Sequence, residues 1–202
     1  KYKSSEKFNS LTWKEYDWLA DLVEIIDKNE KPEELDSEVS IKSQAATYDP
    51  LLSSDPIIYP DQGATISNFA IIDSGDQTAN LLVARRQYRY QFDVSFSRSF
   101  TKVRFGMLIK SLTGFEIGGS ETSGLKVEAS AGEALRLNFP FTCNLNPGNY
   151  YMNAGVLAHI DGEETFVARV IDALQFKVLP NDYHQTGQVD FGIDPEVLSI
   201  SE

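Results

Sequence analysis

The residues best suited to ligand chemistry lie in the stretch from Gly148 to Ile160. Four side chains of mixed polarity alternate with apolar residues there: Tyr151, Asn153, Leu157 and His159. A β-strand places such an alternating set on one face, with Gly155 between them to allow close approach of a ligand. A tyrosine ring can stack on a sugar ring, while an amide and a neutral imidazole each offer a hydrogen-bond donor and an acceptor. This row is therefore the first candidate for a carbohydrate-contacting surface.

Arginine is distributed unevenly. Every arginine lies between Arg85 and Arg169, and lysine is the only cationic residue of the first 60 positions. Arg104 and Arg169 fall on strands expected to neighbour the 148–160 strand, both in outward-facing positions. Because the guanidinium fork matches carboxylates and phosphates, these two residues predict recognition of an anionic group on the ligand. The alternative is that they are scattered solubilising charges.

A second polar row offers an alternative site. Its members are expected on strands of the opposite sheet: Arg89, Gln91, Asp93, Arg136 and Asn138. Asp93 is expected beside Arg89 or Arg104, where it could be an acid held for catalysis, although a surface ion pair explains it better.

Several kinds of chemistry lack the residues they need. The sequence contains no Gly-x-x-x-x-Gly-Lys-[Ser/Thr] loop, no His-Glu-x-x-His and no Gly-x-Ser-x-Gly. One cysteine, Cys143, can form neither an internal disulfide nor a multi-cysteine zinc site, and His159 and His184 lie in different elements. The acidic residues of 161–164 lie in a turn, where solvated charge explains them. We therefore expect no catalytic residues, no metal and no cofactor.

The elements that position the candidate row are β-strands. Tyr150 follows the Pro147-Gly148 turn at the entry of a strand, which is typical of a tyrosine corner. Seven or eight half-buried strands separated by turns follow from Gly63 onward. The pattern predicts an all-β fold, an immunoglobulin-like antiparallel β-sandwich (jelly-roll-like), preceded by a short helical segment.

The domain organisation expected is a helical segment and linker over 1–60, the sandwich over 61–192 and a tail over 193–202. Thr12 and Glu15 have capping-box spacing, and apolar residues recur at helical spacing up to about Lys28. This helix is expected either to dock a partner or dimerise, or to pack on its own sandwich. A last short strand is expected over 187–192, free to exchange between two copies.

The overall composition restricts partners and compartment. The 202-residue chain has a formal net charge of −12, which disfavours non-specific nucleic-acid binding. A single cysteine favours a reducing compartment, and no apolar run is long enough to span a bilayer. The chain opens within a polar helix-like stretch without methionine, so it is expected to be a fragment of a longer protein.

A resemblance to a known family rests on the order and spacing of several motifs. These are Gly63–Ile66, Ile71–Asp73 with Gly75, Lys110–Gly118, Leu145–Tyr150, and Val170–Val178 followed by 187–189. In these motifs the chain resembles the C-terminal carbohydrate-binding domain of the Wzt-type ATPase subunit of O-antigen ABC transporters. It departs from the family at 120–123, where an Asn-Thr pair is usual, and before Gly63.

The resemblance implies a non-catalytic, dimeric module that binds the modified non-reducing end of a lipid-linked O-polysaccharide. Caps read by the family include methyl, methyl phosphate and Kdo. It also implies a cytoplasmic location at the inner face of the inner membrane, with the transmembrane permease subunit as a partner. Contact with the permease would be through a full-length protein that carries the ATPase domain upstream. The alternative function is a structural or dimerisation domain of a transporter or surface-assembly complex, without a glycan site.

Overall fold

The computed structural model describes residues 47, 55–122 and 127–200. The chain divides into two units, 1–42 and 43–202, and all described residues belong to the second. The helical segment expected over the first 60 residues therefore lies almost entirely outside the described residues. All regular structure within the described ranges is β, and they contain no helix that could cross a lipid bilayer.

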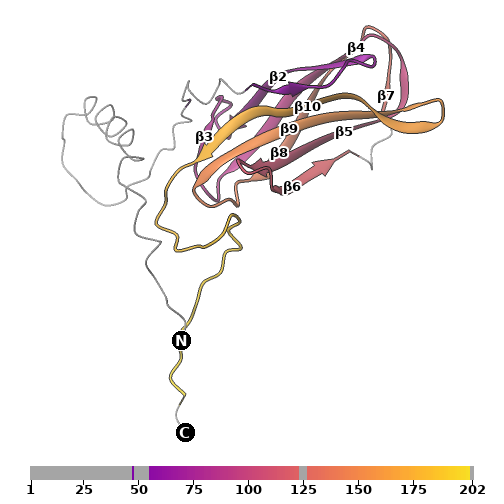
Figure 1. Ribbon diagram of the computed structural model, residues 1–202. Helices are drawn as coiled ribbons and strands as arrows, with labels where there is room; N and C mark the ends of the chain where they lie inside the picture. Colours follow the sequence, from indigo (N-terminus) through magenta and orange to yellow (C-terminus); the bar gives the residue numbers. More distant parts are fainter. Residues whose placement is uncertain (1–46, 48–54, 123–126, 201–202) are drawn as a thin grey trace, which may run out of the picture. The chain divides into compact units, whose positions relative to one another are not determined.

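The larger sheet has seven strands (Figure 1). They are β1 (Ile57–Ile58), β3 (Leu81–Leu82), β5 (Phe100–Ser111), β6 (Glu116–Glu121), β7 (Val127–Ala129), β9 (Gly148–Ile160) and β10 (Glu163–Val178). The main path runs β1-β10-β9-β5-β6, while β3 pairs in parallel with β10 and β7 pairs with β5. Strands β9 and β10 form a long hairpin whose turn holds Asp161 and Gly162 at positive φ.

The smaller sheet is three-stranded and antiparallel, in the order β2-β4-β8. Its strands are β2 (Ala64–Asp73), β4 (Gln87–Phe96) and β8 (Ala134–Thr142). The predicted apolar row of β4 is buried from Tyr88 to Phe96, and its polar residues face the other way. That alternation is the burial pattern of a sheet with one face in the core.

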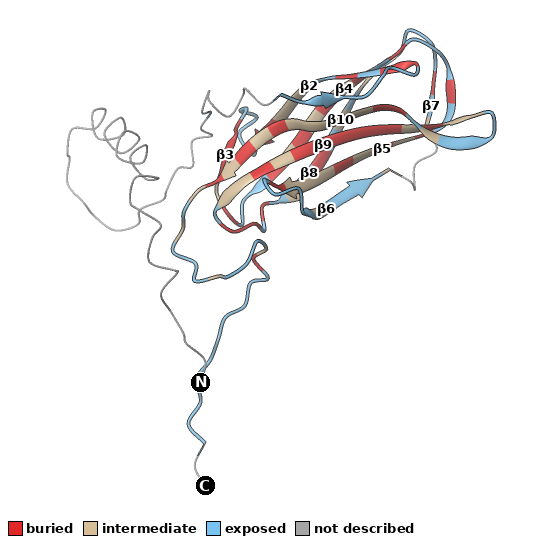
Figure 2. Cartoon of the chain, in the orientation of Figure 1, coloured by how far each residue is buried: buried red, intermediate tan, exposed pale blue. Residues whose placement is uncertain are grey.

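The core lies between the inner faces of the two sheets (Figure 2). On β9, the residues predicted to face inward from Tyr150 to Ala158 are buried, which confirms the expected strand register. Phe92 of the small sheet and Phe105 of the large sheet are among the fully buried side chains. Each such side chain stabilises the fold by roughly 1.5–3 kcal/mol relative to leaving it in water. Cys143 is in this core, where burial raises the pKa of its thiol to about 11.

The tyrosine corner is confirmed. The hydroxyl of Tyr150 donates to the carbonyl oxygen of Asn146 at 2.7 Å, and its ring stacks on Phe176 with centroids 5.5 Å apart. The buried phenol is thus satisfied, and it holds the turn that leads into β9.

One segment differs from the sequence-based interpretation. The segment expected as a last strand over 187–192 forms a single bridge, Leu145 to Val189, instead of a strand. The residues before position 61 also contribute to the sheet, because β1 pairs with β10.

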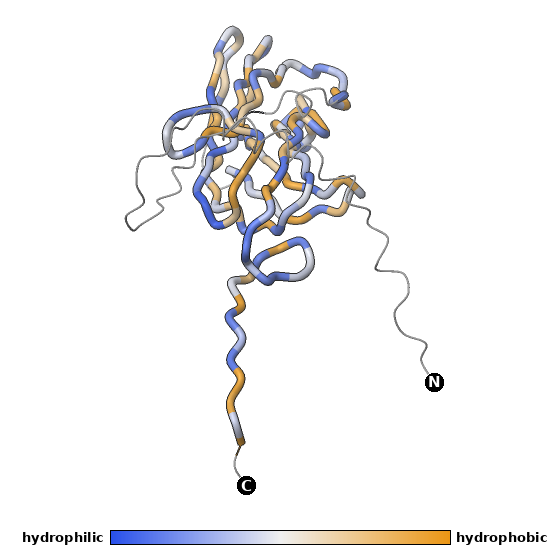
Figure 3. The backbone as a smooth tube through the Cα atoms, turned by 90° about the vertical axis from the view of Figure 1, so that its left-hand side faces the viewer, coloured by the Kyte–Doolittle hydropathy of each residue, from blue (hydrophilic) through white to orange (hydrophobic). Residues whose placement is uncertain are grey.

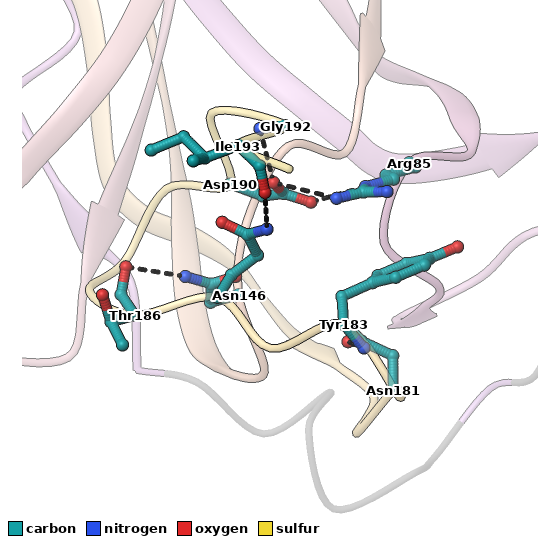
Figure 4. A network of polar contacts seen from close by, with 9 residues as sticks. Arg85, Asn146, Asn181, Tyr183, Thr186, Asp190, Gly192 and Ile193 are labelled. Atoms are coloured by element: carbon teal, nitrogen blue, oxygen red, sulfur yellow. Dashed lines mark hydrogen bonds and ion pairs between the residues drawn. The ribbon is translucent and has the colours of Figure 1, made fainter. Parts of the chain in front are cut away.

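Side-chain hydrogen bonds from Arg85 and Asn146 attach the C-terminal segment to the sandwich (Figure 4). The Arg85 guanidinium donates to the buried carboxylate of Asp190 at 2.6 Å and lies over the Tyr183 ring. Asn146 donates through Nδ2 to the carbonyl oxygens of Thr186 and Gly187. Beyond this anchored stretch the chain exposes several apolar side chains, at Ile193, Val197, Leu198 and Ile200, and apolar and polar stretches alternate along it (Figure 3).

Candidate functional site

The candidate site is a groove of about 350 Å³ on the outer face of the larger sheet. It crosses β10, β9, β5 and β6. Its lining combines glycines, apolar side chains and a few polar groups: Gly106, Met107, Leu108, Gly119, Ser120, Glu121, Asn153, Ala154, Gly155, Leu157, Phe166 and Arg169. Mostly apolar walls with few polar groups are typical of ligand-binding grooves.

One cross-strand row organises the groove. The Cα register pairs Arg169 with Gly155, Gly155 with Gly106, and Gly106 with Glu121. The amide of Tyr59 donates to the carbonyl oxygen of Arg169, which extends the row past β10. From the β10 edge to β6, the row therefore consists of the Tyr59 ring, the Arg169 guanidinium, two glycines and the Glu121 carboxylate. Since the two central residues have no side chain, the middle of the row is lower than both ends.

Phe166 shapes one wall of the groove. A Cβ atom on Gly155 would lie 3.0 Å from Cε1 of Phe166, so the phenyl ring reaches over this glycine. Phe166 pairs across the hairpin with Leu157, which pairs in turn with Arg104. The ring is 39% exposed, so it presents an apolar surface beside the glycine floor. Sugar rings stack on such surfaces through their C–H faces.

The guanidinium of Arg169 is held by two aromatic rings. Its Cζ lies 4.9 Å from the centroid of Phe166 and 5.3 Å from that of Tyr59. No carboxylate forms an ion pair with Arg169 within residues 55–122 and 127–200. Its planar N–H donors therefore remain available to a ligand in the groove, in the geometry that suits a carboxylate or phosphate.

Arg104, the other predicted arginine, has a different environment. Its guanidinium pairs with the carboxylates of both Glu121 and Glu164, and Nε donates to Glu164 at 2.8 Å. The hydrogen bond from Arg104 lowers the pKa of Glu164. With two carboxylates on one guanidinium, this cluster carries net negative charge. It lies at the end of the groove opposite Arg169, so the groove has one cationic side and one acidic side.

Asn153 is positioned by a β-bulge in β10. The register with β9 shifts between Val170 and Leu174, and Asp172 within this bulge has a φ of 57°. The amide of Asp172 donates to Oδ1 of Asn153 at 2.9 Å, while Nζ of Lys110 lies 2.6 Å from the Asp172 carboxylate. This hydrogen bond takes one lone pair of Oδ1, and the Nδ2 group of Asn153 supplies N–H donors for a ligand in the groove.

The six predicted site residues separate into two groups. Asn153, Leu157 and Arg169 line the groove. Arg104 does not line it, but forms an ion pair with Glu121, which does. Tyr151 and His159 share the outward row of β9 without lining the groove. Lys110 lies 5.7 Å from the Tyr151 ring, and His159 is the cross-strand partner of Glu164.

Several residues of the groove were not predicted from the sequence, nor was Tyr59 beside it: Gly106, Gly119, Glu121 and Phe166. The signal for Phe166 was present, since its place across the short 161–162 turn sets it opposite Leu157. Gly119 is required by geometry, because a Cβ there would collide with the carbonyl oxygen of Met107. Tyr59 lies before the expected start of the sandwich, and no pattern in the sequence indicated that it would lie near the groove.

The polar row on the smaller sheet has its charges paired internally. Arg136 donates to both carboxylate oxygens of Asp93, at 2.7 and 2.8 Å, and Asn68 donates to the same carboxylate. These hydrogen bonds lower the pKa of Asp93 to about 2. Arg89 pairs with Asp76. Nor does the described part of the chain contain a group of three or more His, Cys, Asp or Glu residues that could hold a metal ion.

The fold and groove define an all-β sandwich with a tyrosine corner and a candidate ligand surface on one outer sheet face. The family model of the Wzt C-terminal domain matches residues 56–191, and the chain belongs to that family. A solved structure described as the C-terminal domain of Wzt is similar with a TM-score of 0.66 and 22% sequence identity. The match covers 73% of this chain and 92% of that chain, and supports the fold.

Other solved structures share less of the fold. An alkylpurine DNA glycosylase AlkC from Pseudomonas fluorescens is 11% identical with a TM-score of 0.37, over 57% of this chain and 30% of that one. A β-glucosidase from Listeria innocua is 11% identical with a TM-score of 0.34, over 62% and 16%. Neither similarity bears on function. Among proteins with curated functions, none matches the sequence.

Proposed function

We propose that this chain is a non-catalytic carbohydrate-binding module of an O-antigen polysaccharide exporter, and that the groove binds the modified non-reducing end of the lipid-linked O-polysaccharide. Membership of the Wzt C-terminal domain family supports the role in a transporter. The observation that carries the site is the cross-strand row from Tyr59 through Arg169, Gly155 and Gly106 to Glu121.

The shape and chemistry of the groove fit a terminal sugar. Gly155 and Gly106 allow a ring to approach the sheet backbone, and Phe166 offers an apolar face for its C–H groups. Asn153 donates to ring or hydroxyl oxygens, and Glu121 accepts from hydroxyl hydrogens. Tyr151 and His159 lie on the outward row of β9 beyond the two ends of the groove, so the next sugars of the chain would pass one or the other.

The terminal group is proposed to be anionic and to bind at Arg169. This guanidinium and the amide of Asn153 are both donors, and both residues line the groove. A carboxylate or phosphate accepts from both, whereas a methyl ether would leave the guanidinium without a partner. Arg104 contributes indirectly in this proposal, by neutralising part of the charge of Glu121 and Glu164.

In the assembled exporter the module would act at the cytoplasmic face of the inner membrane, as a homodimer, beside the permease and an ATPase domain. Light scattering at micromolar concentration tests the dimer, and a monomeric mass would contradict it. The anchored 186–192 segment and the exposed apolar residues after it are the candidate dimer contacts.

Calorimetric titration with O-polysaccharide tests the binding function. Intact polysaccharide is expected to bind, while polysaccharide lacking its terminal modification is expected to bind at least about tenfold more weakly, since charge-assisted hydrogen bonds are lost. Equal affinity for both would contradict recognition of the terminal group. No binding of either would favour the alternative function, a structural or dimerisation domain without a glycan site.

A further inference from the structure

Residues 57–62 form a short segment, here called the strap, along the outer edge of β10. Ile57 and Ile58 pair with Ile171 and Val170 as strand β1. The amide of Tyr59 then donates to the carbonyl oxygen of Arg169 at 3.0 Å, and that of Gln62 donates to Val167 at 3.1 Å. The strap is thus joined to β10 by backbone hydrogen bonds on both sides of Arg169.

The strap places one side chain beside Arg169. Tyr59 is the cross-strand neighbour of Arg169, and Cζ of the guanidinium lies 5.3 Å from the centroid of its ring. Tyr59 is 44% exposed, so its ring lies partly in solvent. The strap ends where the Asp61 carboxylate accepts hydrogen bonds from the amide of Gly63 and the hydroxyl of Thr65, which fixes the start of β2.

A guanidinium in contact with two rings loses less conformational freedom on binding than a free one. The arginine side chain has a large rotamer entropy, so restricting it beforehand favours ligand binding. Phe166 provides one of the two contacts without the strap. The second contact requires the strap to be docked.

We propose that Tyr59 is a positioning residue for Arg169, so that docking of the strap and binding of an anionic group in the groove stabilise each other. The inference rests on the proposed function of the groove and extends it to a segment outside the groove lining. The chemical class recognised is a carboxylate or phosphate group, and the strap sets how strongly the groove prefers it over a neutral glycoside.

The size of the effect follows from the contact. A cation–π contact at an exposed site corresponds to about a two- to fivefold change in affinity. Tyr59→Ala is therefore expected to weaken anion binding by that factor. Tyr59→Phe keeps the ring and should retain the wild-type affinity. Ile58→Ala is the matched control, because it changes an exposed neighbour on the same strap and leaves the ring in place.

The experiment is an NMR titration of the full chain, following the Arg169 Nε–Hε signal, which is assigned by its loss in Arg169→Lys. The probes are inorganic phosphate, D-glucuronate and the neutral methyl α-D-glucopyranoside. The two anions are expected to shift the signal and the neutral glycoside is not. By reciprocity of linked equilibria, saturating phosphate should also slow hydrogen exchange of the Tyr59 and Gln62 amides, in wild type but not in Tyr59→Ala.

The outcomes separate the two proposals. Phosphate and glucuronate affinities that are the same in Tyr59→Ala and wild type would overturn the strap inference, as would an Arg169 signal that neither anion shifts. O-polysaccharide binding that is lost in Arg169→Ala and has the same affinity in Tyr59→Ala as in wild type would leave the proposed function intact and reject the strap inference alone. Absence of O-polysaccharide binding to the wild type would instead reject the proposed function.

Discussion

Gly155 of β9 and Gly106 of β5 are directly paired across the larger sheet, and this pair forms the floor of the groove. The two positions tolerate a side chain differently. A Cβ on Gly155 meets the Phe166 ring at 3.0 Å, whereas a Cβ on Gly106 meets only Ser120 O at 3.7 Å and Glu121 Cβ at 3.9 Å. Position 106 therefore has room for a methyl group in the folded protein, but that methyl group would occupy the floor of the groove.

Gly106→Ala is expected to weaken ligand binding without unfolding the protein. The free energy of unfolding should change by less than about 1 kcal/mol, since the methyl group makes ordinary contacts. Affinity for O-polysaccharide should fall by about tenfold or more, because the added methyl overpacks the ligand. Calorimetry and thermal unfolding measure the two quantities. Gly118→Ala is the control, with nothing within 4 Å of its Cβ, and should change neither. Unchanged affinity in Gly106→Ala would place the ligand elsewhere.

Arg169→Ala and Arg104→Ala are expected to weaken binding of an anionic ligand for different reasons. Loss of Arg169 removes direct charge-assisted hydrogen bonds, which corresponds to about tenfold to a hundredfold in affinity. Loss of Arg104 leaves Glu121 and Glu164 without their cation, so the ligand is repelled. Adding Glu121→Gln should restore part of the affinity to Arg104→Ala and none to Arg169→Ala. Restoration in both, or in neither, would contradict this assignment.

Tyr150 and Tyr151 are adjacent residues with opposite orientations, and their phenylalanine variants should differ in stability. Tyr150→Phe removes the hydrogen bond to the Asn146 carbonyl oxygen and is expected to cost about 1–3 kcal/mol. Each kcal/mol should lower Tm by about 2–4 °C. Tyr151→Phe alters an outward-facing residue and should stay within about 0.5 kcal/mol of wild type. Equal losses in calorimetric unfolding would argue against the tyrosine corner as a stabilising element.

Docking of the C-terminal segment is expected to weaken in acid. The hydrogen bond from Arg85, and then that from the amide of Gly192, lower the pKa of Asp190 below its ordinary value. A carboxyl group with a lowered folded-state pKa stabilises the docked state above its unfolded pKa, about 3.9, and this stabilisation is lost as the pH falls through the folded pKa. Protection of the Asn146 and Asp190 amides against hydrogen exchange should therefore decrease below about pH 4. Asp190→Asn should show reduced protection at pH 7 and lack the acid-induced change. If neither acid nor Asp190→Asn changes the hydrogen-exchange protection of these amides, the role of the ion pair is contradicted.

The inward and outward faces of the long strands could be predicted from local spacing in the sequence. The strict alternation in β4 and β9 fixes which side chains are inside, because a shift of one residue would turn every apolar side chain to water. The turn before Tyr150 similarly predicted the tyrosine corner, since the residues involved are only four positions apart. Local spacing is sufficient for such features. It also placed Tyr151, Asn153, Leu157 and His159 on one outward row.

Which outward residues share a groove could not be predicted from local spacing. Register across four strands brings Arg169, Gly155, Gly106 and Glu121 into one row, and residues as far apart as Tyr59 and Arg169 meet only through that register. The partners of Arg104 could not be predicted for the same reason, because Glu121 and Glu164 come from different strands. Alternation within a strand fixes the face of a side chain, whereas its neighbours across the sheet depend on strand order and on bulges such as that at Asp172, which long-range packing selects.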